Sequence, residues 1–193
     1  FDRTVASDPT IWLLFGISIL FATLGDYLLL VSTKYADLAD TSILLPLSNF
    51  WTLLIAAIFL GETVSVQKMI AVALIIVGSM LTIMTTGKIV INRGILAITL
   101  YGICAALMNS IDKGIGNAFA IPLYAAISYG ASAIALFLLL GTKRVARIQE
   151  EWKLQGWWLS TIGVLWALFS FMLLSAYRHG DVSSVVPFTR LFI

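Results

Sequence analysis

The sequence has little charge and almost no cysteine. Only 11% of its 193 residues are Asp, Glu, Lys or Arg, against roughly 25% in soluble domains, so the chain does not have the composition of a soluble globular protein. With one cysteine, Cys104, and one histidine, it can form neither an internal disulfide nor a zinc site of four Cys or His ligands. The net charge of +2 is too small and too scattered for the basic surface of a nucleic-acid-binding protein. We expect no metal and no nucleic-acid partner.

Long apolar runs dominate, since 60% of the residues are hydrophobic. Spanning a bilayer takes about 17 to 25 predominantly apolar residues in a helix. Six stretches fit that length, and a seventh begins at residue 181 and stops at residue 193: 11–33, 41–60, 66–86, 95–111, 118–140 and 157–177. Strands are excluded because an isolated run in lipid must satisfy its own backbone, and these runs lack strand alternation. The sequence therefore predicts an all-α, polytopic membrane protein, and its abrupt ends indicate a fragment.

A short internal repeat links the two halves of the chain. DTSILLPLSNFW, at 40–51, aligns without a gap with DVSSVVPFTRLF, at 181–192. The alignment pairs Pro46 with Pro187 and Asn49 with Arg190. Because an odd number of helix positions separates the two copies, the second enters the membrane from the opposite side, as in the inverted repeats of secondary transporters.

This offset predicts two repeats of five helices each, with about seven of the ten helices present. Residues 1–88 then hold the last three helices of the first repeat, and residues 89–193 hold the first four of the second. We expect the polar residues of the two repeats to face each other across the repeat axis.

The segment KYADLADTSILLPLSNFWTLLIAAIFLGETVSVQKMIAVALIIVGSML, at 34–81, resembles the closing half of an EamA repeat in the drug/metabolite transporter superfamily. The resemblance lies in Pro46 early in one helix, Gly61-Glu62 at its end, Gln67 in the connector and Gly78 in the next helix. SAYRHGDVSSVVPFTRLFI, at 175–193, is similar to the same region of the second repeat. The resemblance implies a ten-helix carrier of small metabolites or drugs, without enzymatic activity, in the plasma (inner) membrane.

Four polar residues inside the spans are the candidate substrate-binding residues. Ionisable groups within a span are costly and usually face a cavity or a partner. Asp26 and Arg190 both lie near the predicted midplane, and Asn49 shares the depth of Asp26. Asn109 adds an amide late in its helix. Asp26 is interpreted as a proton-coupling carboxylate, a counter-ion for a cationic substrate, or a structural partner of Arg190, whose planar donors suit a carboxylate or phosphate.

Pro46 and Pro187 are candidate gating positions. A proline inside a helix frees a backbone carbonyl one turn earlier and weakens the helix there. The alternative interpretation is an ordinary packing kink, because membrane helices tolerate proline.

Polar residues at the span ends are interpreted as structural. Glu62 is expected to cap or to pair with Lys68 at the surface, and Asp40 and Asp181 are expected to be helix N-caps. His179, in the last turn between spans, is expected to be solvated.

The alternative functions are a channel or structural subunit and, less favoured, an intramembrane enzyme. Gly25-Asp26 is faintly similar to an aspartyl-protease motif, yet no second carboxylate is predicted at its depth. Without a GxxxxGK[ST] loop the sequence offers no ATP site, so we expect no cofactor. The expected partners are a small-molecule substrate and the lipid bilayer, with a homodimer left open. Orientation also stays open, because the Lys and Arg bias and the family arrangement disagree.

Overall fold

The structure is a computed structural model that describes residues 8–36, 41, 44–86, 92–141 and 145–189. Its elements are helices, and the described residues form no strand. They are α1 (Pro9–Tyr35), the 3-10 turn η2 (Leu45–Leu47), α3 (Ser48–Leu60), α4 (Val66–Thr86), α5 (Arg93–Gly116), α6 (Ile121–Leu140), α7 (Val145–His179) and α8 (Val182–Thr189). The predicted all-α class is confirmed.

Several predicted span bounds differ from those of the helices. The stretch 41–60 was predicted as one continuous span. Thr41 and Leu44 are helical, but a 3-10 turn that contains Pro46 interrupts the regular helix before α3 begins at Ser48. Proline lacks the N–H that a continuous helix needs, and the hydroxyl of Ser48 donates to the carbonyl of Leu45 at 2.7 Å. The fourth span was predicted to end at residue 111, but α5 continues to Gly116 and takes Asp112 into the helix.

Four helices are long and apolar enough to cross a membrane among the residues that the structure describes: α1, α5, α6 and α7 from Ile148 onward. The shorter apolar helices are Ser48–Leu60 and Val66–Gly78. α7 joins residues 145–156 to the sixth predicted span, with a kink at Gln155, whose φ of −132° and ψ of 17° are not helical. Most of its apolar side chains, including all four tryptophans, are exposed, as expected of a surface that contacts lipid. The chain is an integral membrane protein.

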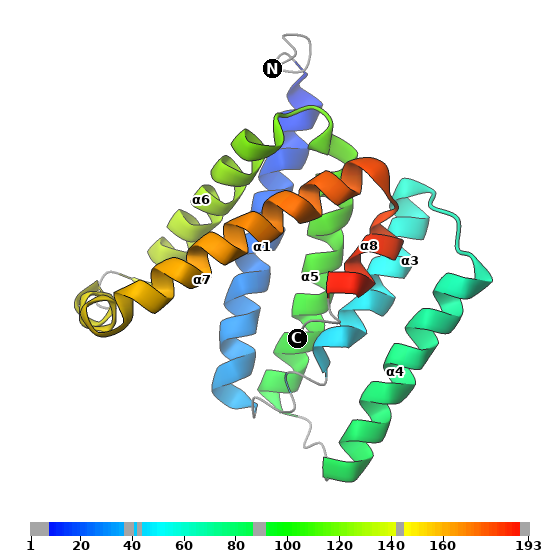
Figure 1. Cartoon of the computed structure of the whole chain (residues 1–193), viewed down its shortest axis with the longest axis horizontal. Helices are drawn as coiled ribbons and strands as arrows, with labels where there is room; N and C mark the ends of the chain where they lie inside the picture. Colours follow the sequence, from blue (N-terminus) through cyan, green and yellow to red (C-terminus); the bar gives the residue numbers. More distant parts are fainter. Residues whose placement is uncertain (1–7, 37–40, 42–43, 87–91, 142–144, 190–193) are drawn as a thin grey trace.

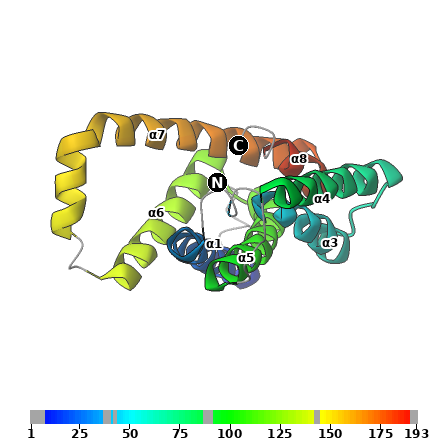
Figure 2. The same cartoon turned by 90° about the horizontal axis from the view of Figure 1, so that it is seen from below.

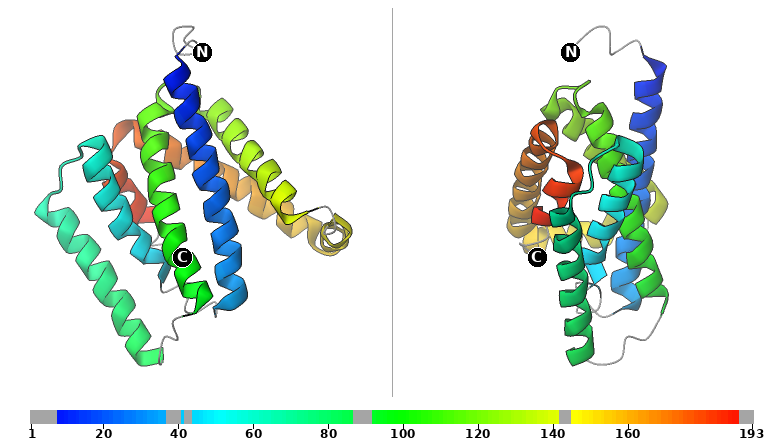
Figure 3. Two further views of the ribbon diagram at one scale, coloured as in Figure 1. Left: turned by 180° about the vertical axis from the view of Figure 1, so that it is seen from behind. Right: turned by 90° about the vertical axis from the view of Figure 1, so that its right-hand side faces the viewer.

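Helix α5 lies in the middle of the fold. Viewed as in Figure 1, the helices follow the order α4, α3, α5, α1, α6, and α7 crosses one face of this row. Figure 2 shows α7 lying along one side, with α1 and α5 on the other. The short α8 packs beside α3, where α7 ends (Figure 3). α5 therefore has neighbours on both flanks and on one face.

Glycines set the spacing of α5 from its neighbours. A Cβ on Gly94 would lie 2.6 Å from the backbone nitrogen of Ala36, at the end of α1. A Cβ on Gly102 would lie 3.2 Å from the Cβ of Ser48 in α3. Without a hydrophobic force between helices in lipid, such close approach is a main source of helix association.

These contacts also define helix direction. Gly25 packs against Cys104, whereas Ala36 lies beside Gly94, so α1 runs antiparallel to α5. α3 runs parallel to α5, because Ser48 lies beside Gly102 and the residue after its other end, Glu62, bonds to Lys113. The C-terminal ends of α3 and α5 and the N-terminal end of α1 therefore lie at the same end of the bundle.

At that end the buried apolar residues form one cluster: Phe15, Ala56, Ile115, Phe119, Tyr124, Leu174, Tyr177, Val182 and Val186. The rings of Phe15, Phe119 and Tyr124 have centroids 5.2 to 5.6 Å apart, a spacing typical of stabilising aromatic pairs. This cluster joins residues from both halves of the chain.

We predict that Gly94→Ala destabilises the protein by about 1 to 3 kcal/mol, because the new methyl group would overlap the backbone of α1. Gly114→Ala is the matched control on the same helix, where a Cβ meets nothing within 4 Å. The control should be neutral or up to about 1 kcal/mol stabilising, from helix propensity alone. Thermal unfolding of the purified protein in detergent measures both. Equal melting temperatures for the two variants would contradict the packing of α1 on α5.

Candidate functional site

Two of the predicted site residues lie at one level of the bundle. Gly25 packs against Cys104 and Ser48 against Gly102, so the neighbouring residues Asp26 and Asn49 flank α5 at the same height.

Asn109 lies seven residues beyond Gly102, roughly 10 Å further along α5, and is therefore not at the level of the other two. Arg190 lies outside the described residues, and its predicted pairing with Asp26 stays a prediction.

Asn49 is the most unusual polar residue of the interior. Its side chain is 1% exposed, and neither its Nδ2 nor its Oδ1 has a hydrogen-bond partner among the residues that the structure describes. The indole Nε1 of Trp51, two residues on, is also buried, and the described residues provide no partner for it. An unsatisfied buried polar group costs about 1 to 3 kcal/mol, and in native proteins such a group usually has a water, ion or ligand as its partner. The substrate-binding role of Asn49 stays a prediction.

Asp26 lies on a different kind of surface. Its side chain is exposed, and the described residues provide no ion pair for it. It lies within electrostatic range of Tyr129 on α6, and Tyr129 is in turn within range of Asp112. The three side chains thus mark a polar strip along α1, α5 and α6. The role of Asp26 in substrate binding stays a prediction.

The two candidate gating prolines lie in different local structures. Pro46 is in the 3-10 turn before α3, whereas Pro187 is inside α8. Both are partly buried. Their role in gating stays a prediction.

A buried carboxylate that the sequence analysis missed joins three helices. Asp112 of α5 is 6% exposed and accepts hydrogen bonds on Oδ1 from the hydroxyls of Ser18 in α1 and Tyr124 in α6. The bond from Tyr124 is 2.5 Å long. The predicted span 95–111 stops one residue before Asp112, so the prediction leaves it outside the membrane helix. The signal that could have placed it in the helix is the apolar spacing of Ile111 and Ile115, which continues the helical face through it.

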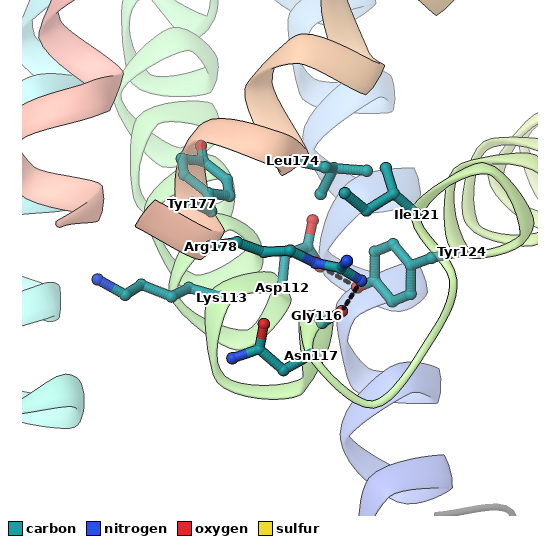
Figure 4. A pocket seen from close by; sticks show the side chains of 9 residues that line it. All are labelled: Asp112, Lys113, Gly116, Asn117, Ile121, Tyr124, Leu174, Tyr177 and Arg178. Atoms are coloured by element: carbon teal, nitrogen blue, oxygen red, sulfur yellow. Dashed lines mark hydrogen bonds between the residues drawn. The ribbon is translucent and has the colours of Figure 1, made fainter. Parts of the chain in front are cut away.

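A small pocket lies beside this carboxylate, between the last turn of α5, the start of α6 and the end of α7 (Figure 4). It has room for about one water molecule, far below the size of a metabolite site. At its rim Arg178 donates to the carbonyls of Gly116 at 3.0 Å and Phe119 at 2.5 Å. A cation at this place satisfies the free carbonyls at the end of α5. The pocket is therefore a helix-capping crevice rather than a substrate cavity.

An ionic network joins four segments at the same end of the bundle. Glu62, in the turn between α3 and α4, accepts a bond from the Nζ of Lys113 at 3.0 Å. Lys68 of α4 pairs with Asp181 at 2.7 Å and donates to the hydroxyl of Ser183 at 2.9 Å. Lys113 also lies 3.6 Å from Asp181. The expected pairing of Glu62 with Lys68 is wrong, because each residue has a different partner.

Glu62, rather than Asp181, provides the side-chain cap of α8. Its carboxylate accepts from the backbone N–H groups of Val182 at 2.8 Å and Ser183 at 3.1 Å, and from the hydroxyl of Ser183. These N–H groups have no partner within the helix, and a negative charge is favourable there. The predicted N-cap role of the Asp181 side chain is therefore wrong, and its carboxylate faces two lysines instead. The other predicted cap, Asp40, lies outside the described residues.

The electrostatics of these two carboxylates follow from their partners. Burial raises the pKa of Glu62, but hydrogen bonds from Ser183, Lys113 and the N-terminus of α8 outweigh it, so the pKa lies below its usual 4.5. The hydrogen bond from Lys68 lowers the pKa of the Asp181 carboxyl. Both groups are therefore charged at neutral pH. The described residues contain no group of three His, Cys, Asp or Glu side chains that could hold a metal ion.

Comparison with known proteins gives one match. Residues 1–84 match the model of the EamA-like transporter family, so the resemblance predicted from residues 34–81 is confirmed. The match includes α1, α3 and most of α4, and therefore Asp26, Asn49 and Glu62. No curated protein and no solved structure matches the chain.

We predict that Asp112→Ala is strongly destabilising, because it leaves the buried hydroxyls of Ser18 and Tyr124 without their acceptor. Each orphaned group costs about 1 to 3 kcal/mol. Asp112→Asn retains an oxygen acceptor of similar size and should lose less stability. Thermal melts of both variants measure the difference. An Asp112→Asn variant as unstable as Asp112→Ala would indicate that the charge, and not the acceptor, is required.

We also predict a pH dependence of stability from Glu62. Because its pKa in the folded chain is below the usual 4.5, its contribution is complete above about pH 4.5 and disappears as the pH falls through the lower, folded value. The melting temperature of wild type should therefore exceed that of Glu62→Gln at pH 7, and the difference should shrink as the pH falls below 4.5 and through the lower, folded pKa. A difference that stays constant with pH would contradict this assignment.

Proposed function

We propose that this chain forms part of a secondary active transporter that moves small metabolites or drugs by alternating access, because residues 1–84 match the model of the EamA-like transporter family. In this proposal residues 1–88 and 89–193 belong to two inverted repeats in a multi-pass protein of the plasma (inner) membrane. The family consists of transporters rather than enzymes.

The buried, unpaired amide of Asn49 carries the proposal. It lies in the segment that matches the transporter family, on the face of α3 near its close contact with α5. An amide has two donor hydrogens and an acceptor oxygen, so it suits a substrate group that can both donate and accept. A polar group left unsatisfied lowers stability and is retained where binding uses it.

The other predicted residues complete the proposed cavity. Asp26 lies at the level of Asn49 and adds a negative charge near the midplane, where a charge usually faces a substrate path. Asn109 and Arg190 are proposed to extend the polar lining toward the two ends, and Pro46 and Pro187 to be the positions where the helices bend. Transport then consists of one repeat rocking against the other around this level.

The test of this proposal is a ligand-dependent thermal shift on the purified protein in detergent. Amino acids, organic anions, nucleotide sugars and lipophilic cations are screened, since a ligand that binds the native state raises its stability. We expect one class to raise the melting temperature of wild type and of the control Asn117→Ala, an exposed amide. Asn49→Leu should abolish the shift.

Asn49→Leu also separates a binding role from a structural one. Replacing an unpaired buried amide with an apolar side chain of similar size should leave the unliganded protein as stable as wild type or more stable by about 1 to 3 kcal/mol. A substantial loss of stability in Asn49→Leu would identify Asn49 as a structural residue. If no ligand class shifts the melting temperature of wild type, a structural subunit becomes the better interpretation.

A further inference from the structure

The bonds of Glu62 connect parts of the chain that are far apart in sequence. Its carboxylate lies in the turn after α3, while the N–H groups that it accepts from begin α8, about 120 residues later. The bond from Lys113 ties the same carboxylate to the end of α5. One side chain therefore determines how α8 is held against the helix that carries Asn49.

The start of α8 has no side-chain cap of its own among the described residues. The carboxylate of Asp181 is directed to Lys68 and Lys113, so the first N–H groups of α8 depend on Glu62. Lys68, Lys113 and Asp181 are each partly exposed to solvent. Water can replace the bonds of this network when it opens, which makes the contact reversible.

A dry apolar layer lies directly beneath the network. Val182 and Val186 of α8 and Ala56 of α3 belong to one buried cluster and are at most 3% exposed. Since Glu62 follows α3 and contacts the start of α8, while Ala56 and Val186 lie further along both helices, α8 runs antiparallel over α3. Its first two turns therefore cover the stretch of α3 that leads from this end of the bundle toward Asn49.

The first two turns of α8 lie over the part of α3 between this end of the bundle and Asn49. Asn49 lies eleven residues before Leu60, the last residue of α3, or about 17 Å along the helix axis. The ionic network and the buried apolar contact between α3 and α8 lie between this end of the bundle and that level. Apolar constrictions close transport pathways by excluding water.

We propose that the N-terminal turns of α8 are the gate of this carrier at this end and that Glu62 is the latch that holds the gate closed. This proposal rests on the proposed transport function and adds the position of one gate. Opening requires the Glu62 carboxylate to release Val182, Ser183 and Lys113, after which Val186 becomes accessible to water.

The test uses cysteine labelling, which needs no knowledge of the substrate. Cys104, the only cysteine, is buried and is replaced in a Cys104→Ala background. The reporter is Val186→Cys, beneath the latch, and the reference is Ile98→Cys, a buried aliphatic position toward the other end of α5. The rate of reaction with a water-soluble maleimide is measured for each in detergent, so that both sides of the protein are accessible.

We expect Glu62→Ala to raise the labelling rate at Val186→Cys roughly tenfold or more, because charge-assisted bonds worth about 1.5 to 3 kcal/mol are lost. Glu62→Gln keeps an acceptor but loses the charge and should give a smaller increase. The rate at Ile98→Cys should not change. Glu150→Gln, an exposed glutamate on α7, is the matched control and should leave both rates unchanged.

Two results would overturn the gate. An unchanged rate at Val186→Cys in Glu62→Ala would show that Glu62 does not hold α8 closed, even if ligands bind at Asn49. Faster labelling at both reporters would show general loosening of the bundle and a structural role only. Failure of the proposed transport function is seen separately, in the ligand screen, because the labelling rates do not depend on substrate.

Discussion

The fold depends on the last two turns of α5, where Asp112 and Lys113 are consecutive. Successive side chains on a helix are rotated by about 100° around its axis. The side chains of Asp112 and Lys113 therefore contact different sides of the bundle. Asp112 binds α1 and α6 through hydroxyl groups, and Lys113 binds the turns before α4 and α8 through Glu62, the carbonyl of Gly180 and Asp181. In lipid, where apolar burial does not favour one helix contact over another, such polar contacts and close packing decide which helices associate.

Carboxylates at one end of the bundle have hydrogen-bond partners, whereas the buried amide in its middle has none among the described residues. At the end where α5 terminates, Asp112, Glu62 and Asp181 each face donors from two segments, and the aromatic cluster lies beneath them. At the level of Gly102, α5 and α3 approach each other closely, and the amide of Asn49 has no hydrogen-bond partner among the described residues. One end of the bundle is thus firmly connected, and its middle is left with unused hydrogen-bonding capacity.

Much of the fold could be predicted from apolar length, which identified every described helix longer than one turn within a few residues at most ends. The errors occur where a side chain's partner is distant in sequence. Nothing near Asp112 indicates that Ser18, 94 residues away, neutralises the cost of placing a carboxylate inside the helix. The cap of α8 could not be predicted from the sequence either, because Glu62 and Val182 are brought together only by tertiary packing. For the site, the polarity of Asn49 within an apolar run made it a candidate binding residue, whereas only the structure shows that the described residues provide no hydrogen-bond partner for its amide.

The aligned segments around the two prolines differ in local structure, and this difference bears on the mechanism. Pro46 lies in a 3-10 turn between Leu44, which is helical, and the start of α3, whereas the aligned Pro187 is inside the regular helix α8. In the proposed inverted repeat, the two halves have similar sequences here but a different helix type around the proline. A proline ring lacks the N–H of a helical bond in either setting, so Pro46 and Pro187 each mark a place where a helix is weakened, as the proposed gating role would require.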